Sequence, residues 1–208
     1  MELTLATLSR LASPLPRGRV FRNAWAPSPE YSLTRNSTLT GQYPQRAAST
    51  RITDIFRDAG FIVTEGLEPY PEGSDVFRLL EEPTVLPDTG IVACAVLSDP
   101  SALTVWWPEV AEDGESFELV SPMDLAPTLA AIAGLDVRPN AALSFDGLNL
   151  VPVLRYGADA HAALFFENGI RTQDAWLLDG EVSDESRRTA LQDEWELWRS
   201  FMGYGPLQ

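Results

Sequence analysis

The sequence predicts an α/β protein, with a central mixed sheet flanked by helices and a small C-terminal antiparallel hairpin followed by a helix. Residues 91–97 and 102–107 are apolar and continuous rather than alternating, which is typical of strands in a sheet covered on both faces. Residues 121–135 carry the clearest helical pattern, because their larger aliphatic side chains fall on one stripe. Buried strands beside amphipathic helices indicate a layered α/β domain.

The N-terminal half is expected to alternate helices and strands. Residues 3–12 read as a short helix packed on the core, and residues 20–25 read as a short strand. Residues 51–60 form an amphipathic helix that stops at a glycine, and residues 61–64 continue as a strand. Residues 75–82 are expected to form another short helix.

The C-terminal part has a different pattern. Residues 163–178 read as two or three short antiparallel strands, with the Asn168-Gly169 pair as a strong turn signal. Residues 184–202 read as a helix whose tryptophans anchor it to a core, although they could also mark a partner surface. We therefore expect a main domain over 1–157 and a small subdomain over 158–208 of the same unit.

Charge and composition argue against several classes of function. The net charge is −15, and all 15 basic residues are arginines, which disfavours binding to nucleic acid or to an anionic membrane. No apolar run approaches the ~20 residues that cross a bilayer, and the first residues do not resemble a signal peptide. Cys94 is the only cysteine, so no intramolecular disulfide forms. These observations favour the cytoplasm.

The stretch 31–44 is the most informative about function. A proline-punctuated loop leads into a short helical turn rich in hydroxyl side chains, with Arg35 among them and Gly41 as its stop. Hydroxyls and a planar guanidinium at such a turn suit an oxyanion such as sulfate or phosphate. The alternative is a helix cap rich in serine and threonine that carries a surface arginine.

The same stretch resembles the signature of the sulfatase family in the alkaline phosphatase superfamily. The matching residues are Arg35, Leu39, Thr40, Gly41, Tyr43 and Pro44. Residues 121–135 and 145–154 resemble two further conserved segments of that family. The resemblance covers roughly residues 3–65 and 100–180, and implies a condensed sulfatase-like fold.

The resemblance also implies a degenerate catalytic site. Tyr31 stands where the family carries the Cys or Ser that becomes formylglycine, and Thr34 stands where Ser is usual. Tyr31, Thr34 and Arg35 are therefore the signature-equivalent catalytic positions, and only Arg35 matches. The family's first strand with its paired metal-binding aspartates, its lysines and its second histidine are expected to have no counterpart here.

The sequence as a whole favours a sulfatase-like protein without catalysis, which binds a protein partner or itself as a homo-oligomer and needs no cofactor or metal. The alternatives are an ester hydrolase with a substituted nucleophile, needing a divalent cation such as Ca²⁺ or Mg²⁺, or one half of a hetero-oligomeric enzyme. In the hydrolase, Ser32 and Thr38 are further nucleophile candidates. Carboxylates that could rebuild a metal site are Glu30, Glu65, Asp99 and Asp174.

Three further polar residues have an architectural interpretation. Asp124 and Asp146 lie in the two segments that resemble structural parts of the family, so we expect a helix cap and a turn residue. His161 is the only histidine, and without a second one it is expected at the surface rather than in a metal site.

Overall fold

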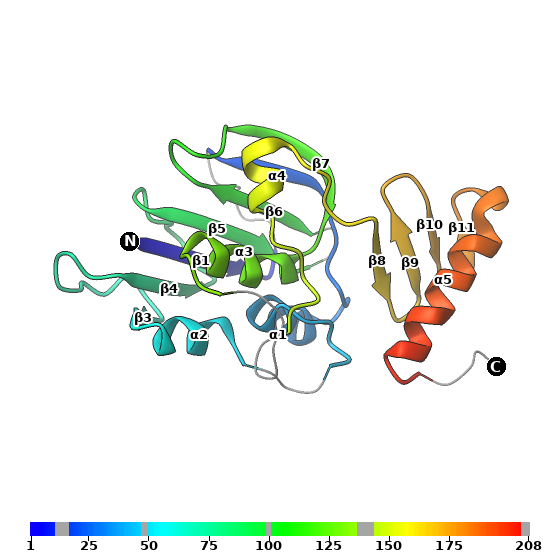
Figure 1. Cartoon of the computed structure of the whole chain (residues 1–208), viewed down its shortest axis with the longest axis horizontal. Coiled ribbons are helices and arrows are strands. Elements are labelled where there is room, and N and C mark those ends of the chain that lie inside the picture. The colour runs from blue at the N-terminus through cyan, green and yellow to red at the C-terminus, as the bar shows by residue number, and fades with distance from the viewer. Residues whose placement is uncertain (11–16, 47–49, 99–100, 137–143, 205–208) are drawn as a thin grey trace. The chain divides into compact units, whose positions relative to one another are not determined.

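The structure is a computed structural model that describes residues 1–10, 17–46, 50–98, 101–136 and 144–204. It divides into two compact units, Met1–Ala160 and His161–Gln208. The first unit is built on a seven-stranded mixed sheet and the second on a four-stranded sheet with one long helix (Figure 1). The predicted α/β class is therefore confirmed.

In the large sheet β1 is an interior strand, third in spatial order. Its strands, in spatial order, are β3 (Ile62–Thr64), β4 (Val76–Glu81), β1 (Glu2–Leu8), β5 (Ile91–Val96), β6 (Ala102–Trp106), β2 (Arg19–Ala24) and β7 (Gly114–Val120). β1 is parallel to both of its neighbours, β4 and β5, whereas β6 runs antiparallel to β5 and β2. Since β1 and β4 are parallel and in register, their carboxyl ends lie at the same edge.

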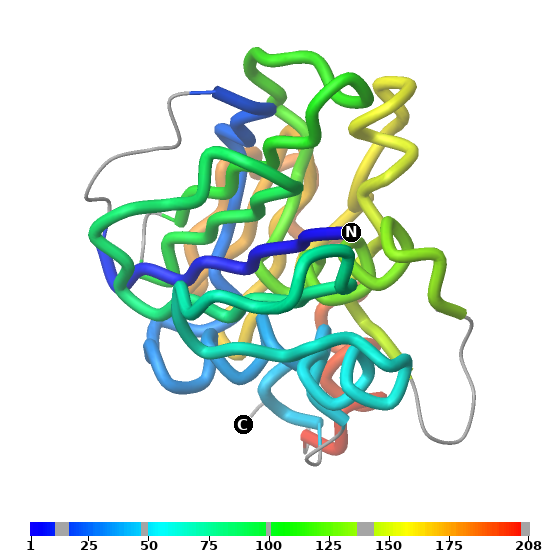
Figure 2. The backbone as a smooth tube through the Cα atoms, turned by 90° about the vertical axis from the view of Figure 1, so that its left-hand side faces the viewer, coloured from blue at the N-terminus to red at the C-terminus, as the bar shows by residue number. Residues whose placement is uncertain are grey.

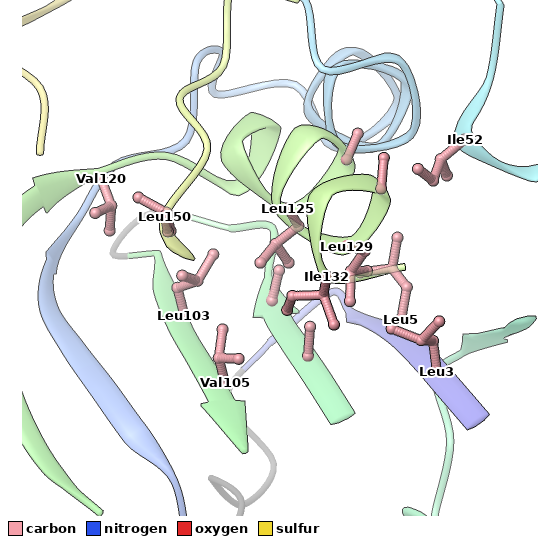
Figure 3. Packing of buried hydrophobic residues seen from close by; sticks show 14 of the residues in the cluster. Leu3, Leu5, Ile52, Leu103, Val105, Val120, Leu125, Leu129, Ile132 and Leu150 are labelled. Carbon is pink, nitrogen blue, oxygen red and sulfur yellow. The ribbon is translucent and has the colours of Figure 1, made fainter. Parts of the chain in front are cut away.

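The helices of this unit pack on one face of the sheet (Figure 1). They are α1 (Tyr31–Thr40), α2 (Ile52–Asp58), α3 (Leu125–Ile132), entered through a 3₁₀ turn at Pro122–Asp124, and α4 (Val151–Tyr156). Figure 3 shows Leu125, Leu129 and Ile132 of α3 pointing at the strands. The tube view in Figure 2 shows these helices on one side of the sheet.

The other face carries a smaller apolar cluster without helical residues. Among the described residues, it joins strand side chains such as Leu8, Cys94 and Trp106 to Leu86 of the β4–β5 connection. Arg17 covers Trp106 with its guanidinium, 3.7 Å from the ring centroid. This face is therefore covered by coil in the part of the chain that the structure describes.

Two helix predictions are wrong. Residues 3–12 were expected to be helical, but Glu2–Leu8 is the interior strand β1, and residues 75–82 contain strand β4. Both segments bury side chains on the two faces of the sheet, so their apolar residues do not alternate and imitate a short helix. The expectation that the first strand is missing is corrected by the same finding.

Most of the other helices and strands predicted in this unit are confirmed. The strands expected at 20–25, 61–64, 91–97 and 102–107 and the helices at 51–60 and 121–135 are present, and their ends differ by at most four residues. β7 was not predicted, because Gly114–Val120 mixes glutamates with apolar residues and half of its length is exposed. None of the described helices is long and apolar enough to cross a membrane.

The second unit is an antiparallel sheet with a packed helix. Its strands are β8 (Ala163–Phe166), β9 (Gly169–Thr172), β10 (Trp176–Leu178) and β11 (Glu181–Val182), followed by a 3₁₀ turn at Glu185–Arg187 and α5 (Arg188–Phe201). The predicted turn is confirmed, because Phe166 pairs with Gly169. A Cβ atom on Gly169 would lie 1.9 Å from the Leu177 carbonyl oxygen, so only glycine fits.

Candidate functional site

Helix α1 presents the signature stretch, and its threonines face inward. Thr34 and Thr38 are fully buried, and their hydroxyls donate to the carbonyls of Ser28 (2.7 Å) and Thr34 (2.8 Å). Both hydroxyls therefore satisfy backbone carbonyls at the start of the helix and are closed to a substrate. Ser32, in contrast, is exposed in the first turn.

The end of α1 is clasped to the loop before α4. Gly41 adopts the left-handed conformation with φ of 67°, and its carbonyl accepts from the backbone N–H groups of Asp146 (2.8 Å) and Gly147 (2.9 Å). The Asp146 carboxylate accepts from the Tyr43 N–H (3.0 Å) and from the Arg46 guanidinium. Two of the segments that carry the sequence resemblance thus lie against each other.

Asp124 holds a second clasp at the start of α3. It is fully buried, and its two carboxylate oxygens accept from the backbone N–H groups of Ser121 (2.8 Å) and Leu148 (2.7 Å). An ionised carboxylate with two backbone donors is well satisfied without a ligand. The contacts of Asp124 and Asp146 are thus those of the cap and turn residues that the sequence predicted.

Arg35 is engaged by a carboxylate from the neighbouring strand. Its Nε donates to Glu81 Oε1 at 3.1 Å, and Nη2 donates to the same oxygen. The hydrogen bond to Glu81 is the main reason that the pKa of Arg35 rises above its ordinary value. Both side chains are partly exposed, at 28% for Arg35 and 44% for Glu81. The edge of the Arg35 guanidinium that could bind an oxyanion is therefore already bound to the Glu81 carboxylate.

Tyr31 stands at the first position of α1, half-buried, with the hydroxyl of Thr7 beside its own. Burial first, and then the charges of Glu82 and Glu81, raise the pKa of the Tyr31 phenol above its ordinary value, against the opposing effect of Arg35. The phenol therefore stays protonated at neutral pH. A neutral phenol is a weak nucleophile without a base or a metal ion.

The carboxyl ends of β1 and β4 are tied together by Glu82. Its carboxylate accepts from the Ser9 N–H (2.5 Å), and its own N–H donates to the Thr7 carbonyl (2.9 Å). Glu82 has a left-handed φ of 48°, which costs on the order of 1 kcal/mol for a residue with a Cβ atom. Glu65, Glu81 and Glu82 line an open groove of about 360 Å³ beside this turn. The surroundings of Arg35 are thus acidic.

The acidic side chains of the described residues do not gather into a metal-ligand cluster. None of their histidine, cysteine, aspartate and glutamate side chains forms a group of three or more with metal-ligand geometry. Glu81 is held by Arg35 and Glu82 by the Ser9 N–H, so these carboxylates already have partners. Of the carboxylates considered for a rebuilt site, Asp174 pairs with Arg187 in the second unit, and Asp99 lies outside the described residues.

The structure brings Tyr31 and Arg35 together with three residues that the sequence reasoning missed. Thr7, Glu81 and Glu82 were not singled out, because the segments that carry them were assigned to helices. Reading 2–8 and 76–81 as parallel strands would have placed their carboxyl ends, and so these side chains, beside α1. His161 is half-buried in the second unit.

Comparison with known proteins adds the fold family. No protein-family model matches the sequence, and no curated protein matches it significantly. Crystal structures of Ps i-CgsB, free and with k-i-k-neocarrahexaose, match with TM-scores of 0.68 and 0.66 at 11% identity, covering 97% of this chain and 92% of theirs. BT4656, bound to its substrate D-glucosamine-2-N,6-O-disulfate, matches with a TM-score of 0.66 at 11% identity, covering 89% of this chain and 91% of that one.

A protein of the alkaline phosphatase superfamily from Vibrio parahaemolyticus matches with a TM-score of 0.56 at 11% identity, covering 99% of this chain and 88% of that one. Identities this low establish the fold and leave the activity open. The chain has the α/β fold of the sulfatase-like proteins of the alkaline phosphatase superfamily.

Proposed function

We propose that this chain is a sulfatase-like protein that does not hydrolyse sulfate or phosphate esters and acts by binding a partner, either another protein or a second copy of itself. The observation that carries the proposal is the ion pair between Arg35 and Glu81, which fills the signature arginine with an internal carboxylate. The single buried cysteine accords with a cytoplasmic location, which we propose as well.

The electrostatics of the site support this proposal. A sulfate ester approaching Arg35 has to displace Glu81 and then lie beside Glu65 and Glu82. Like charges repel by about 1 kcal/mol at 4 Å even in bulk water, and by more near a protein surface. The chain has no lysine that could offset them. An anionic substrate would therefore be attracted only weakly by Arg35 and repelled by the glutamates at this edge of the sheet.

The state of the candidate nucleophiles also supports the proposal. Tyr31 keeps its proton at neutral pH, and the threonine hydroxyls of α1 donate to backbone carbonyls. Sulfate transfer needs an activated nucleophile and positive charge on the departing group. Among the described residues, neither Tyr31 nor the buried threonines are activated, and the charge of Arg35 is already paired with Glu81.

The test is a paired measurement on the full chain. Metal content is determined after dialysis against Ca²⁺ and Mg²⁺, and hydrolysis of 4-nitrophenyl sulfate and 4-nitrophenyl phosphate is followed with and without a chelator. D-glucosamine-2-N,6-O-disulfate, the substrate of the structural relative BT4656, is assayed in parallel. We expect no stoichiometric metal and no turnover above buffer.

Turnover that disappears with Arg35→Ala, with Tyr31→Phe or with the chelator would overturn the proposal in favour of a hydrolase with a substituted nucleophile. Glu65→Gln is the matched control, because it removes a charge from the same groove without touching Arg35. Co-purification with a chain that restores turnover would instead identify one half of a hetero-oligomeric enzyme. Light scattering after gel filtration reports whether the partner is a second copy.

A further inference from the structure

Helix α5 of the second unit has a buried face that accounts for only part of its apolar residues. Leu191 and Trp198 are buried, and Trp198 stacks on Phe165 of β8 with 5.4 Å between ring centroids. Trp195, half-buried on the same stripe, donates its indole N–H to the Phe166 carbonyl at 2.9 Å. These contacts fix the side of α5 that faces the four-stranded sheet.

A second apolar stripe runs along the same helix and faces solvent. Leu197 and Phe201 lie one turn apart, and each is 73% exposed. At about 100° per residue, Ala190, Glu194, Leu197 and Phe201 fall within roughly 60° of one another, about a quarter turn from the buried face. We call these four residues the α5 ridge. Ala190 and Glu194 are exposed as well.

The exposed charges on and beside the α5 ridge are negative. Glu194 lies on the ridge and Asp193 beside it; both are exposed, and no described arginine pairs with either. The basic residues of α5 are engaged elsewhere. Arg188 pairs with Glu185, and Arg199 donates to the Glu167 carbonyl and lies over the rings of Trp195 and Tyr204. The ridge thus combines two large apolar side chains with uncompensated negative charge.

We propose that the α5 ridge docks a basic amphipathic helix, whose apolar side chains cover Leu197 and Phe201 and whose lysines or arginines meet Asp193 and Glu194. Apolar anchors one turn apart match the i, i+3, i+4 spacing of such a helix. Carboxylates around the anchors favour a basic partner over a neutral or acidic one. This docking site goes beyond the proposed function and does not depend on whether the chain hydrolyses esters.

A second copy of the chain is the less suitable occupant. Two α5 ridges placed face to face would bring their acidic flanks together in a chain whose net charge is already −15. Two exposed side chains also fall far short of the ~800 Å² per partner that a stable dimer buries, since even a phenylalanine contributes only about 200 Å². A short helix bound through a few anchors needs less area.

The test uses the full chain and a fluorescein-labelled 18-residue peptide of leucine and lysine, with leucines at helical i, i+3, i+4 spacing. A scrambled peptide of the same composition has the same charge but no apolar stripe. We expect the patterned peptide to bind at least about tenfold more tightly than the scrambled one by fluorescence anisotropy. The Leu197→Gln/Phe201→Gln variant should remove that advantage, and Asp193→Asn/Glu194→Gln should weaken binding severalfold.

The matched control is Phe117→Gln, which removes an apolar side chain that is 65% exposed on β7 of the first unit. It should leave peptide affinity unchanged. Circular dichroism should show native helix content for every variant, because each changes an exposed residue. Equal binding of the two peptides, or full binding by the Leu197→Gln/Phe201→Gln variant, overturns the proposal. So does a wild-type dimer that this variant converts to a monomer, because the occupant is then a second copy.

Discussion

Asp124 offers a direct measure of how the sulfatase-like segments hold the fold together. Its two carboxylate oxygens accept from two backbone N–H groups, of Ser121 and Leu148, in a fully buried position. In Asp124→Asn one oxygen becomes an NH₂ group, which faces an N–H donor and leaves it unsatisfied. In Asp124→Ala both donors lose their acceptor.

The expected cost follows from the price of an unsatisfied buried donor, about 1–3 kcal/mol each. Asp124→Asn should therefore lower the free energy of unfolding by about 2 kcal/mol and Asp124→Ala by about 4 kcal/mol. For a chain of this size, about 2 kcal/mol corresponds to a melting temperature lower by roughly 4–8 °C. A purely catalytic aspartate would not show this pattern.

The assay follows the unfolding of the first unit through the accessibility of its single thiol, Cys94, to a labelling reagent in increasing urea. Cys94 is buried in β5, so labelling reports the opening of this sheet rather than of the second unit. Asp54→Asn on α2 is the control, because its pair with Arg57 is exposed on both sides and should contribute less than about 0.5 kcal/mol. If Asp124→Asn proves as stable as this control, the clasp at Asp124 does not stabilise the fold and the reasoning fails.

Two further predictions concern titrating groups. Burial raises the pKa of the Cys94 thiol to about 11, so at pH 8 its labelling in native protein should be at least roughly 100-fold slower than that of a free thiol; a comparable rate would contradict its burial. The Ser186 hydroxyl and N–H lower the pKa of Asp184, so this contact stabilises the second unit above the ordinary pKa of an aspartate, about 4, and the stabilisation is lost as the pH falls below it. In Asp184→Asn, the stability of the second unit should therefore depend less on pH in the acid range. Hydrogen exchange of the α5 amides measures this stability, and a pH dependence equal to that of the wild type would contradict the proposed contribution of the contact.

Residue patterns were sufficient where large apolar side chains recur at helical spacing or where a turn signal is present. The helices at 51–60 and 121–135 and the hairpin at Asn168-Gly169 each carry a periodic stripe or a turn with a single interpretation. β1 and β4 have no such asymmetry, because both of their faces are buried. A short apolar run of this kind is compatible with a buried helix or a buried strand, and only the neighbouring strands decide between them.

The same ambiguity limited the prediction of the site. Tyr31 and Arg35 could be selected from the signature stretch, and their place at one end of α1 followed from its helical pattern. Glu81 could not be selected, because its contact with Arg35 depends on β4 being a strand parallel to β1. The carboxylate that pairs with Arg35 belongs to a residue 46 positions away, so no local sequence pattern indicates this pair.

The position of β1 between β4 and β5 has a consequence for how the chain folds during synthesis. Glu2 pairs with Val76 on one side, and Leu3 pairs with Ile91 on the other, so β1 is made well before either of its neighbouring strands. At about 5–20 residues per second, roughly 4–15 s pass on the ribosome before β4 is complete, and longer before β5 follows. During that time the segment Leu-Thr-Leu-Ala-Thr-Leu is an unpaired apolar strand. Folding of this unit is thus governed by distant pairing, and the nascent chain is most prone to aggregation before its middle third has been made.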